Sequence, residues 1–325
     1  MIRMAIVGYG NLGRGVETSI RQNKDMELVA VFTRRDPASI QLQTPGVQVL
    51  PLAQLDSFGE KVDVLILCGG SATDLPEMTP ALAQKFNVVD SFDNHSRIPE
   101  HIANVHRAAK CNGKTAIVSC GWDPGMFSLA RVYAQAALPE GETYTFWGPG
   151  LSQGHSDAVR RIPGVLDARQ YTLPVEEALQ KVRNGENPVL TTRQKHTRVC
   201  YVVAEEGADR DAITQAIVTM PAYFADYDTT VHFITAQEMA EKHATMPHGG
   251  FVIRAGQTAD GSRHTIEYSL KLESNPKFTS SILVSCARAA VRMHERGEHG
   301  CFTMPEIRPC DLLPDPIEEI RAHMI

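Results

Sequence analysis

The stretch Arg3-Met-Ala-Ile-Val-Gly-Tyr-Gly-Asn-Leu-Gly13 decides the fold of this chain. Its first half is a short apolar run typical of a buried strand, and it breaks directly into three glycines and then into helix-like sequence. Gly8 permits the tight turn off the strand, Gly10 allows a pyrophosphate to approach the backbone, and Gly13 allows the helix to pack closely on the sheet. Glycine-rich turns also end strands for purely steric reasons, but a strand before and a helix after favour a dinucleotide site. The residues expected to contact the dinucleotide here are Gly8, Tyr9, Gly10, Asn11, Leu12 and Gly13.

The end of the second expected strand, residues 28–32, indicates which dinucleotide binds. Enzymes selective for NAD place an acid about 20 residues past the glycines, where it accepts hydrogen bonds from the ribose 2′-hydroxyl. Here that position holds Thr33, followed by Arg34 and Arg35. Guanidinium groups suit a 2′-phosphate because each offers a planar fork of donors with a permanent charge. The sequence therefore predicts NADP; the alternatives are that both arginines are solvated, or that Asp36 turns back toward the ribose.

Composition excludes several classes of partner. The 325 residues allow two domains, and a net charge of -6 argues against a nucleic-acid or anionic-membrane partner. The seven cysteines are scattered without a CxxC pair, so we expect neither a disulfide framework nor a metal site, as suits a reducing cytoplasm. No apolar run approaches 18 residues, and the N-terminus enters a strand without a signal segment. We expect a soluble cytoplasmic protein that acts on a small molecule.

The first part of the chain alternates strand-like and helix-like segments. The runs 62–68, 88–89 and 115–119 are each followed by a helical pattern, and this alternation predicts a doubly wound parallel sheet. Ligands of such sheets bind at the carboxyl ends of the strands. Cofactor contacts expected at these ends are Gly69, Gly70, Ser71, Ala72, Ser91, Phe92, Asp93, Cys120, Gly121, Trp122, Asp123 and Pro124.

From residue 143 the pattern changes to longer alternating runs, such as 198–203 and 263–272. Such runs predict a mixed sheet with helices on one face. The fold class is therefore α/β: a Rossmann-type doubly wound parallel sheet plus a second α+β domain for substrate binding and dimerisation. We expect the dinucleotide-binding domain to span residues 1–121, completed by 297–325, and the second domain to span 122–296.

Three short stretches are dense in functional side chains. Residues 121–126 follow a strand and precede a helix, and their Asp123 is either a functional acid or only a helix N-cap. Residues 146–157 hold too many glycines and polar groups for a core strand and are expected to form a ligand loop. Residues 246–250 place His248 in a turn, where a lone histidine is more often structural than functional.

The motifs of this sequence closely resemble those of the meso-diaminopimelate dehydrogenases over nearly the whole chain. The matching segments are 7–14, 70–74, 93–95, 121–127, 145–157, 161–164, 170–174, 246–250 and 272–276. The resemblance implies NADP-dependent, reversible oxidative deamination of the D-centre of meso-2,6-diaminopimelate. The products would be ammonia and L-2-amino-6-oxopimelate, which cyclises to tetrahydrodipicolinate, a precursor for lysine and peptidoglycan. The resemblance also implies a homodimer.

The resemblance assigns residues to both ends of this substrate. Asp93 and Asp123 would be the acidic partners of the D-centre amine, with Trp122 and Trp147 near its carboxylate. Thr172, Arg198 and His248 would hold the distal carboxylate, with Asn275 nearby; Arg198 suits that task because its fork pairs a carboxylate bidentately. The neighbouring loop would contribute Gln153, Gly154 and Asp157.

The chemistry itself demands little from the protein beyond placing two reactants. The amine lone pair moves toward the α-carbon as the α-hydrogen leaves as hydride, so no strong base is required at that carbon. We expect Asp123 to accept a hydrogen bond from the amine and to relay its proton or orient the hydrolytic water. His248 could serve as an acid or base, but binding is favoured.

Three other functions compete with this interpretation. A cyclic-imine reductase similar to the dihydrodipicolinate reductases would need a basic His/Lys-rich signature, which we do not find. A dinucleotide-sensing regulator would not need paired acids and an arginine clamp. A broad D-amino-acid dehydrogenase is disfavoured because unpaired polar groups would penalise substrates that lack the distal carboxylate.

Overall fold

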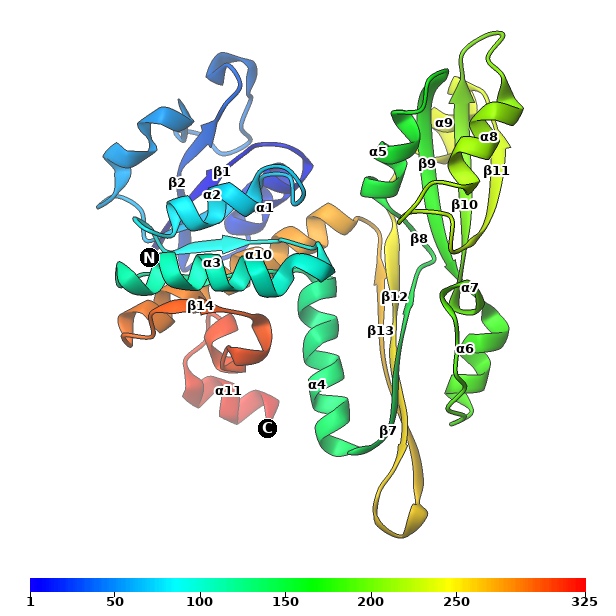
Figure 1. Ribbon diagram of the computed structural model, residues 1–325. Coiled ribbons are helices and arrows are strands. Elements are labelled where there is room, and N and C mark those ends of the chain that lie inside the picture. Colours follow the sequence, from blue (N-terminus) through cyan, green and yellow to red (C-terminus); the bar gives the residue numbers. More distant parts are fainter. The chain divides into compact units, whose positions relative to one another are not determined.

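The computed structural model describes residues 1–325 and divides into two compact units. The first unit comprises Met1–Leu129 and Pro276–Ile325, and the second comprises Ala130–Asn275. Figure 1 labels the elements of both. Each unit has its own sheets and its own core, so each is described by itself.

The first unit is built on a seven-stranded parallel sheet in the order β14-β6-β5-β4-β1-β2-β3. The order reverses between β1 and β4, which is the switch point where doubly wound sheets bind ligands. The predicted fold class is confirmed, although sequence patterns did not identify the short edge strands β3 and β14. The strands are β1 (Ile2–Val7), β2 (Met26–Thr33), β3 (Gln48–Pro51), β4 (Val64–Leu67), β5 (Val88–Asp90), β6 (Thr115–Ile117) and β14 (Gly300–Phe302).

Helices cover both faces of this sheet. Val16 and Ile20 of α1 join Leu283 of α10 in one core cluster, and Leu75 of α2 joins Val105 of α3 in the other. The helical elements of the unit are α1 (Asn11–Arg21), α2 (Leu75–Leu82), α3 (Ile98–Cys111), α10 (Asn275–Glu295), α11 (Ile317–Met324), η1 (Pro37–Ser39), η2 (Leu52–Phe58), η3 (His95–Arg97), η4 (Trp122–Met126), η6 (Met304–Glu306) and η7 (Pro309–Leu312).

The unit boundaries differ from those expected from the sequence. The first boundary lies within α4 (Phe127–Ala137), and α10, which we expected in the second domain, belongs almost wholly to the first unit. The reason is that one face of α10 is apolar and packs into the same core as α1. Nearly the whole of α10 is therefore part of the first unit.

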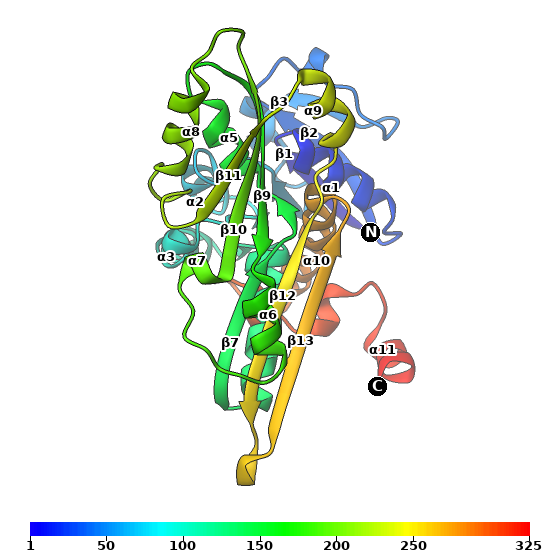
Figure 2. The same ribbon diagram turned by 90° about the vertical axis from the view of Figure 1, so that its right-hand side faces the viewer.

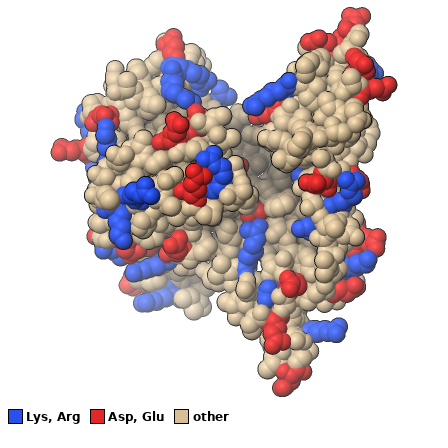
Figure 3. Space-filling view, viewed as in Figure 1, with Lys and Arg blue, Asp and Glu red and all other residues tan.

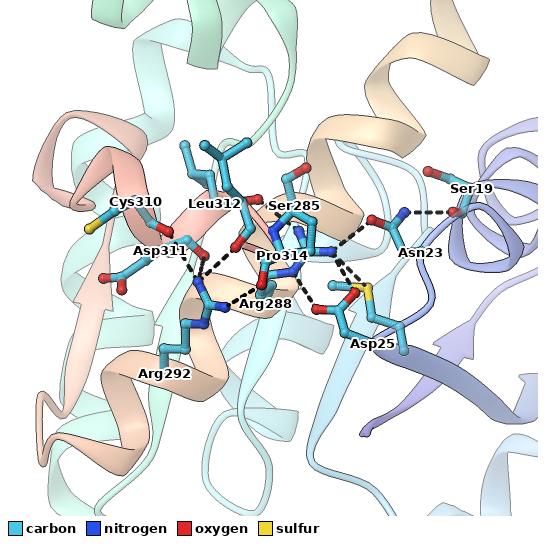
Figure 4. Close-up of polar contacts among 12 residues, drawn as sticks. Ser19, Asn23, Asp25, Ser285, Arg288, Arg292, Cys310, Asp311, Leu312 and Pro314 are labelled. Carbon is cyan, nitrogen blue, oxygen red and sulfur yellow. Dashed lines mark hydrogen bonds and ion pairs between the residues drawn. The ribbon is translucent and has the colours of Figure 1, made fainter. Parts of the chain in front are cut away.

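Arg288 and Arg292, one turn apart on α10, attach the C-terminal segment to this unit (Figure 4), and Arg296, just after the end of α10, adds a third contact. Arg288 is 1% exposed and donates to both carboxylate oxygens of Asp25 at 2.7 and 2.9 Å and to the carbonyl of Leu312 at 2.7 Å. Arg292 donates to several carbonyls of residues 310–314, and Arg296 pairs with Asp311 at 2.7 Å. A buried guanidinium thus replaces most of its lost hydration with protein acceptors.

The second unit contains two sheets. One is mixed, in the order β11-β10-β9-β8, with β10 parallel to β11 and antiparallel to β9. The other is an antiparallel ribbon in the order β13-β12-β7, whose strands lie side by side along their length in Figures 1 and 2. The strands are β7 (Glu140–Trp147), β8 (Gly150–Leu151), β9 (Val165–Pro174), β10 (His196–Ala204), β11 (Asp228–Phe233), β12 (His248–Gln257) and β13 (Arg263–Leu272).

Helices cover one face of each of these sheets. Val159 of α5 and Ile213 of α8 pack on the mixed sheet, while Leu179 and Val182 of α6 pack on the ribbon. The mixed sheet of the second unit is as predicted. The helical elements are α5 (Gln153–Arg160), α6 (Glu176–Arg183), α7 (Thr192–Lys195), α8 (Arg210–Val218), α9 (Ala236–Lys242) and η5 (Ala259–Gly261).

Two local predictions in this unit are wrong. Residues 146–157 do not form one continuous loop: they include the end of β7, the short strand β8 and the first turn of α5, and their contact with a ligand stays a prediction. His248 does not lie in a turn but begins β12, where it pairs with Leu272. In both places the glycines allow neighbouring backbone segments of the same chain to approach closely. This packing depends on the tertiary structure, so local composition does not reveal it.

The surface in view carries acidic and basic side chains interspersed over each unit (Figure 3). None of the helices combines the length and apolar content that a membrane-spanning helix requires. The structure also gathers no group of three or more side chains suited to hold a metal ion.

Candidate functional site

The glycine-rich turn has the geometry that a pyrophosphate needs. Gly8 has a φ of 94°, in the left-handed region, and a Cβ on Gly13 would lie 2.3 Å from the carbonyl oxygen of Gly8. Nothing lies within 4 Å of the corresponding position on Gly10, which is also the N-cap of α1 and provides no capping side chain. The first amide groups of α1 are therefore available to an anion.

A cavity of about 250 Å³ opens beside this turn and brings together eight of the 21 predicted cofactor residues, from the glycine turn, the end of β2 and the segment after β4. Thr33, Arg34 and Arg35 line it. The Thr33 hydroxyl accepts from the Arg35 amide at 3.0 Å, and the Arg35 guanidinium donates to the carbonyl of Tyr9. Thr33 ends β2 and is buried, while Arg34 and Arg35 follow it with exposed side chains at the pocket mouth. The lining residues are Val7, Gly8, Tyr9, Gly10, Phe32, Thr33, Arg34, Arg35, Leu52, Cys68, Gly69, Gly70, Asp74 and Met78.

The acid nearest to this cavity was not identified from the sequence. Asp74 pairs with Arg34 at 2.8 Å and accepts from the Gly70 amide at 2.8 Å. Asp36, by contrast, caps the turn that follows it by accepting from the Ala38 amide at 3.0 Å, so it does not return to the ribose position. Asp74 is the N-cap residue of α2, and no local spacing rule marks its contact with Arg34.

A second hollow of about 410 Å³ adjoins the first and shares Arg34, Leu52, Asp74 and Met78 with it. Its other lining residues include Leu55 and several apolar groups of α2. The pair of hollows offers the guanidinium groups of Arg34 and Arg35, interspersed with the carboxylates of Asp56, Asp74 and Glu77, beside an apolar wall. That combination suits a phosphorylated ribose next to a flat base.

The loops after β4 and β5 meet at the carboxyl edge of the sheet, as predicted. The Asp93 amide donates to the Ser71 hydroxyl at 2.9 Å, and the Asp93 side chain is exposed. These loops thus bring two of the expected cofactor and substrate contacts together. Their carboxylate faces solvent and can meet a cationic amine.

The segment after β6 is irregular rather than a helix N-terminus. Asp123 has φ -155° and ψ 105°, outside the helical region, and it lies four residues before the start of α4. It is therefore not the N-cap of that helix. Trp122 is 8% exposed and packs edge-on against Phe127 at 5.3 Å between ring centroids. Asp123 remains half-buried, which leaves its carboxylate usable in chemistry.

In the second unit, three neighbouring strands place a cluster of binding groups at one level. Thr172 of β9 lies opposite Arg198 of β10 and also opposite Gly150 of β8. A Cβ on Gly150 would lie 2.5 Å from the His248 ring, so this glycine allows the ring to pack directly on the strand. The predicted trio Thr172, Arg198 and His248 is thus assembled from strands far apart in the sequence.

Arg198 is a buried cation without an acidic partner in the chain. It is 6% exposed, donates to the Thr172 hydroxyl, and lies with its guanidinium carbon 4.0 Å from the centre of the Tyr227 ring. Its Nε is buried without a hydrogen-bond partner. Burial lowers the pKa of the Arg198 guanidinium from its usual value, although an arginine remains charged. An uncompensated buried charge is costly, so this site favours an anionic ligand.

Three histidines around Arg198 are kept neutral. Burial, reinforced by the Arg198 charge, lowers the pKa of His155 and of His196 to about 3 and that of His248 to about 4. The hydrogen bonds agree with neutral rings: His196 accepts the Trp147 amide at 2.8 Å, and His248 Nδ1 accepts the Gly249 amide at 2.8 Å. The cluster can therefore bind a carboxylate through one full charge and several neutral polar groups.

The remaining predicted substrate residues lie at varied distances from this cluster. The Gln153 side chain donates to the Met246 sulfur at 2.9 Å, and the Asn275 backbone amide donates to the Met246 carbonyl at 3.0 Å. Met246 lies two residues before His248. The Trp147 ring stacks on His196 at 5.3 Å between centroids. Asp157 is half-exposed and pairs with Arg160. Gly154, at the start of α5, has open space around its Cβ position.

Sequence reasoning missed three residues of the cluster: His155, His196 and Tyr227. His155 lies inside a quoted motif, and its position beside Ser152, to which it bonds at 2.7 Å, could have suggested a fixed ring. His196 lies two residues before Arg198 on the same face of β10, a period-2 signal. No sequence signal marks Tyr227.

Comparison with known proteins assigns the chain to a family. A family model for the diaminopimelic acid dehydrogenase C-terminal domain matches residues 121–274. The meso-diaminopimelate D-dehydrogenase of Acetivibrio thermocellus is 56% identical over 326 residues, which cover 100% of this chain and 98% of that protein. The chain belongs to the meso-diaminopimelate D-dehydrogenase family.

Solved structures agree with this assignment. One solved structure is a variant of the meso-diaminopimelate dehydrogenase of Clostridium tetani with six substitutions, bound to diaminopimelate. It is 50% identical to this chain, the match covers 100% of both chains, and the TM-score is 0.94. An engineered D-amino acid dehydrogenase bound to NADP⁺ is 49% identical, covers 100% of this chain and 99% of that chain, and gives a TM-score of 0.89. The fold and family are therefore shown over the full length.

The substituted positions of the Clostridium variant have counterparts in this member of the dehydrogenase family. They are, in order, a glutamine, a threonine, an arginine, a proline, a histidine and an asparagine. The same residue types occur here in the same order and at the same intervals: Gln153, Thr172, Arg198, Pro247, His248 and Asn275. Five of these six are among the substrate residues predicted from the sequence.

Proposed function

We propose that this protein catalyses the NADP-dependent, reversible oxidative deamination of the D-centre of meso-2,6-diaminopimelate to L-2-amino-6-oxopimelate and ammonia. Family membership supports the reaction class. The observation in the structure that carries the substrate is the buried, unpaired Arg198 beside Thr172 and His248. A dehydrogenase for simple amino acids would have no use for a second, distant carboxylate site.

The cofactor residues fit NADP. Gly10 offers open space where a pyrophosphate would approach, and the end of β2 supplies two guanidinium groups and a hydroxyl for a 2′-phosphate. Arg34 would exchange its partner Asp74 for the phosphate, a dianion at neutral pH. When bound, the cofactor supplies the acceptor for the α-hydrogen. The similar structure bound to NADP⁺ supports the same choice.

The distal carboxylate of the substrate is assigned to the Arg198 cluster. Its guanidinium can donate from the free Nε and a terminal nitrogen, which is the bidentate pattern for a carboxylate. Thr172 orients the guanidinium, and His248 offers a neutral ring beside it. Gln153 and Asn275, both attached to Met246, would complete the polar rim.

The reacting end is assigned to Asp93 and Asp123, with Trp122 and Trp147 beside the carboxylate. A carboxylate that accepts a hydrogen bond from the neutral amine orients the amine, so that the nitrogen lone pair points toward the α-carbon as the α-hydrogen leaves as hydride. Asp123 then orients the water that hydrolyses the iminium of the substrate and takes a proton from it. Because no proton leaves the α-carbon, positioning is the larger contribution of the protein.

The reverse reaction would supply diaminopimelate for lysine and peptidoglycan. The seven cysteines are all unpaired, including buried Cys200 and Cys286, and this supports work in a reducing cytoplasm.

We also propose a homodimer. The second unit exposes Val132, Tyr133 and Ile266, large apolar side chains that a second copy could cover. Light scattering on purified protein over a range of concentrations would test it.

The decisive experiment offers the purified protein meso-, L,L- and D,D-diaminopimelate and D-alanine, each with NADP and with NAD, and follows NADPH or NADH formation. Rapid turnover confined to the meso isomer with NADP is expected. Comparable rates with D-alanine would mean that the distal cluster does not select substrates and would favour a broad D-amino-acid dehydrogenase. No turnover with any of them would favour an imine reductase or a sensor.

A further inference from the structure

A buried carboxylate that the proposed reaction does not use lies beneath the reacting end of the first unit. Asp90 is the last residue of β5 and is 0% exposed. Its Oδ1 accepts from two backbone amides, those of Phe92 at 3.0 Å and Ser119 at 2.9 Å. Its carbonyl oxygen accepts from a third, that of Cys120 at 2.9 Å. One residue therefore fixes the chain just after β5 and just after β6.

The other carboxylate oxygen is anchored from the helices. Oδ2 of Asp90 lies 2.7 Å from the Thr79 hydroxyl of α2 and 2.7 Å from Nε2 of His101 of α3. His101 is 4% exposed and stacks on the Phe92 ring at 4.2 Å between centroids. Both oxygens have two donors each, so the orientation of this carboxylate is fixed from four directions.

The two backbone segments held by Asp90 lead directly to the proposed reactive acids. Asp93 follows Phe92, and Asp123 lies four residues after Ser119. Ser119 has a φ of 58°, a left-handed conformation that a residue with a Cβ seldom adopts without compensating contacts. The bond from its amide to Asp90 is such a contact.

We propose that Asp90, oriented by His101 and Thr79, is a positioning residue that sets the relative placement of Asp93 and Asp123. This inference rests on the proposed function for the identity of the reactive acids. Buried carboxylates with complete hydrogen bonding hold backbone geometry tightly, and a displacement of a reacting group by about 1 Å can cost about 100-fold in rate. Asp90 itself touches neither substrate nor cofactor in this assignment.

The test compares Asp90→Ala and Asp90→Asn with Thr79→Val as the matched control. Alanine removes all four side-chain acceptor bonds, whereas asparagine can still accept from both amides through its oxygen. Thr79→Val removes one bond on the side away from the loops. We expect kcat for meso-diaminopimelate to fall about 10- to 100-fold in Asp90→Ala, less in Asp90→Asn, and less than about threefold in Thr79→Val.

Two further measurements separate positioning from general destabilisation. Substrate deuterated at the D-centre should show a larger isotope effect on kcat in Asp90→Ala, because hydride transfer becomes slower relative to product release. Amide hydrogen exchange should rise in residues 91–94 and 119–124, while it stays unchanged in the Gly8 to Gly13 turn, which Asp90 does not contact. Folded Asp90→Ala with wild-type kcat and isotope effect would overturn the proposal, even with a lower melting temperature.

If neither Asp90 variant folds, His101→Ala carries the same measurements, since it removes one anchor of Oδ2 and also the ring stacked on Phe92, a contact that Thr79→Val leaves in place. Unchanged kcat, isotope effect and loop exchange in that variant would overturn the proposal. Failure of the proposed function is a separate result, because it appears as absence of turnover in the wild-type protein. In that case loop exchange in Asp90→Ala still decides whether Asp90 holds the two segments.

Discussion

The guanidinium carbon of Arg198 lies 4.0 Å from the centre of the Tyr227 ring. Arg198 belongs to β10, which pairs with β9, the strand that carries Thr172. The aromatic face stabilises a cation that has no carboxylate partner in the chain, by about 2 kcal/mol for a desolvated pair. The Nε of the guanidinium still has no hydrogen-bond partner. The arginine is thus kept buried and oriented while part of its fork stays free for a ligand.

Replacing Arg198 with methionine should reduce kcat/KM for meso-diaminopimelate by about 100-fold or more, because a charge-assisted pair with the distal carboxylate is lost. The dissociation constant of NADP should stay within about threefold of the wild-type value. Steady-state kinetics and cofactor titration measure the two effects. Arg193→Met is the matched control, since Arg193 is half-exposed and pairs with Asp228 on the surface. Equal losses in catalysis and cofactor binding would show that the assignment is wrong.

Replacing Arg34 with alanine should weaken selection of NADP over NAD. The loss of one charge-assisted bond to a 2′-phosphate costs roughly 1.5 to 3 kcal/mol, about 10- to 100-fold in KM for NADP, with little change for NAD. Initial rates with each cofactor give the ratio. Arg97→Ala, which removes an exposed pair with Glu100, should leave the ratio unchanged. An unchanged ratio in Arg34→Ala would instead assign the phosphate to Arg35 and Thr33.

Two alanine substitutions in the glycine turn should affect different properties, one the stability of the unbound protein and the other its affinity for NADP. A Cβ on Gly13 would meet the Gly8 carbonyl at 2.3 Å, so Gly13→Ala should lower the melting temperature of the unbound protein. Gly10→Ala meets nothing within 4 Å and should fold normally, but it should weaken NADP binding by at least about tenfold, since the methyl occupies the pyrophosphate approach. Calorimetry with and without NADP distinguishes them. Normal NADP affinity in Gly10→Ala would place the pyrophosphate elsewhere.

The buried histidines of the second unit should make it sensitive to acid. Burial lowers the pKa of His196 to about 3, below the value near 6.5 of an unfolded histidine. The unfolded chain then binds the extra proton first, so the stabilising effect is complete above pH 6.5 and is lost as the pH falls toward 3. Between pH 7 and 5 the unfolding free energy should fall by roughly 2 kcal/mol for each such histidine.

His196→Gln isolates this effect, since its amide oxygen can still accept the Trp147 amide and does not titrate. Urea unfolding of both proteins at pH 7 and pH 5 should show a smaller decrease in the variant. Because carboxylates titrate alike in both, the difference reports His196. The same decrease in the two proteins would contradict a depressed pKa.

Arg288→Met should destabilise the first unit without changing its chemistry. The substitution leaves Asp25 and Asn23 without their buried donor and frees the C-terminal segment at Leu312, a loss of about 3 to 5 kcal/mol. The melting temperature should fall, while kcat at temperatures well below the transition stays near the wild-type value. Arg321→Met, at an exposed position of α11, should leave the melting temperature unchanged. A wild-type melting temperature in Arg288→Met would mean that the buried contacts contribute little.

The sequence by itself determined the Rossmann-type sheet, because strand, glycine turn and helix are encoded within Arg3 to Gly13 and their physics is local. It also pointed to Thr33, Arg34 and Arg35, since the end of the second strand is a fixed number of residues from the turn. It did not reveal that α10 belongs to the first unit or that His248 begins a strand, because both depend on which distant apolar face or glycine lies opposite.

The tertiary structure decided how the binding groups are combined. Thr172 and Arg198 are 26 residues apart in the chain, and only the register of β9 against β10 makes them neighbours. The link from Asp90 to the segment after β6 likewise spans 29 residues and depends on the order of the parallel strands. A sequence pattern reports what a residue and its near neighbours can do, but burial and register set the charge, partners and orientation that make them a site.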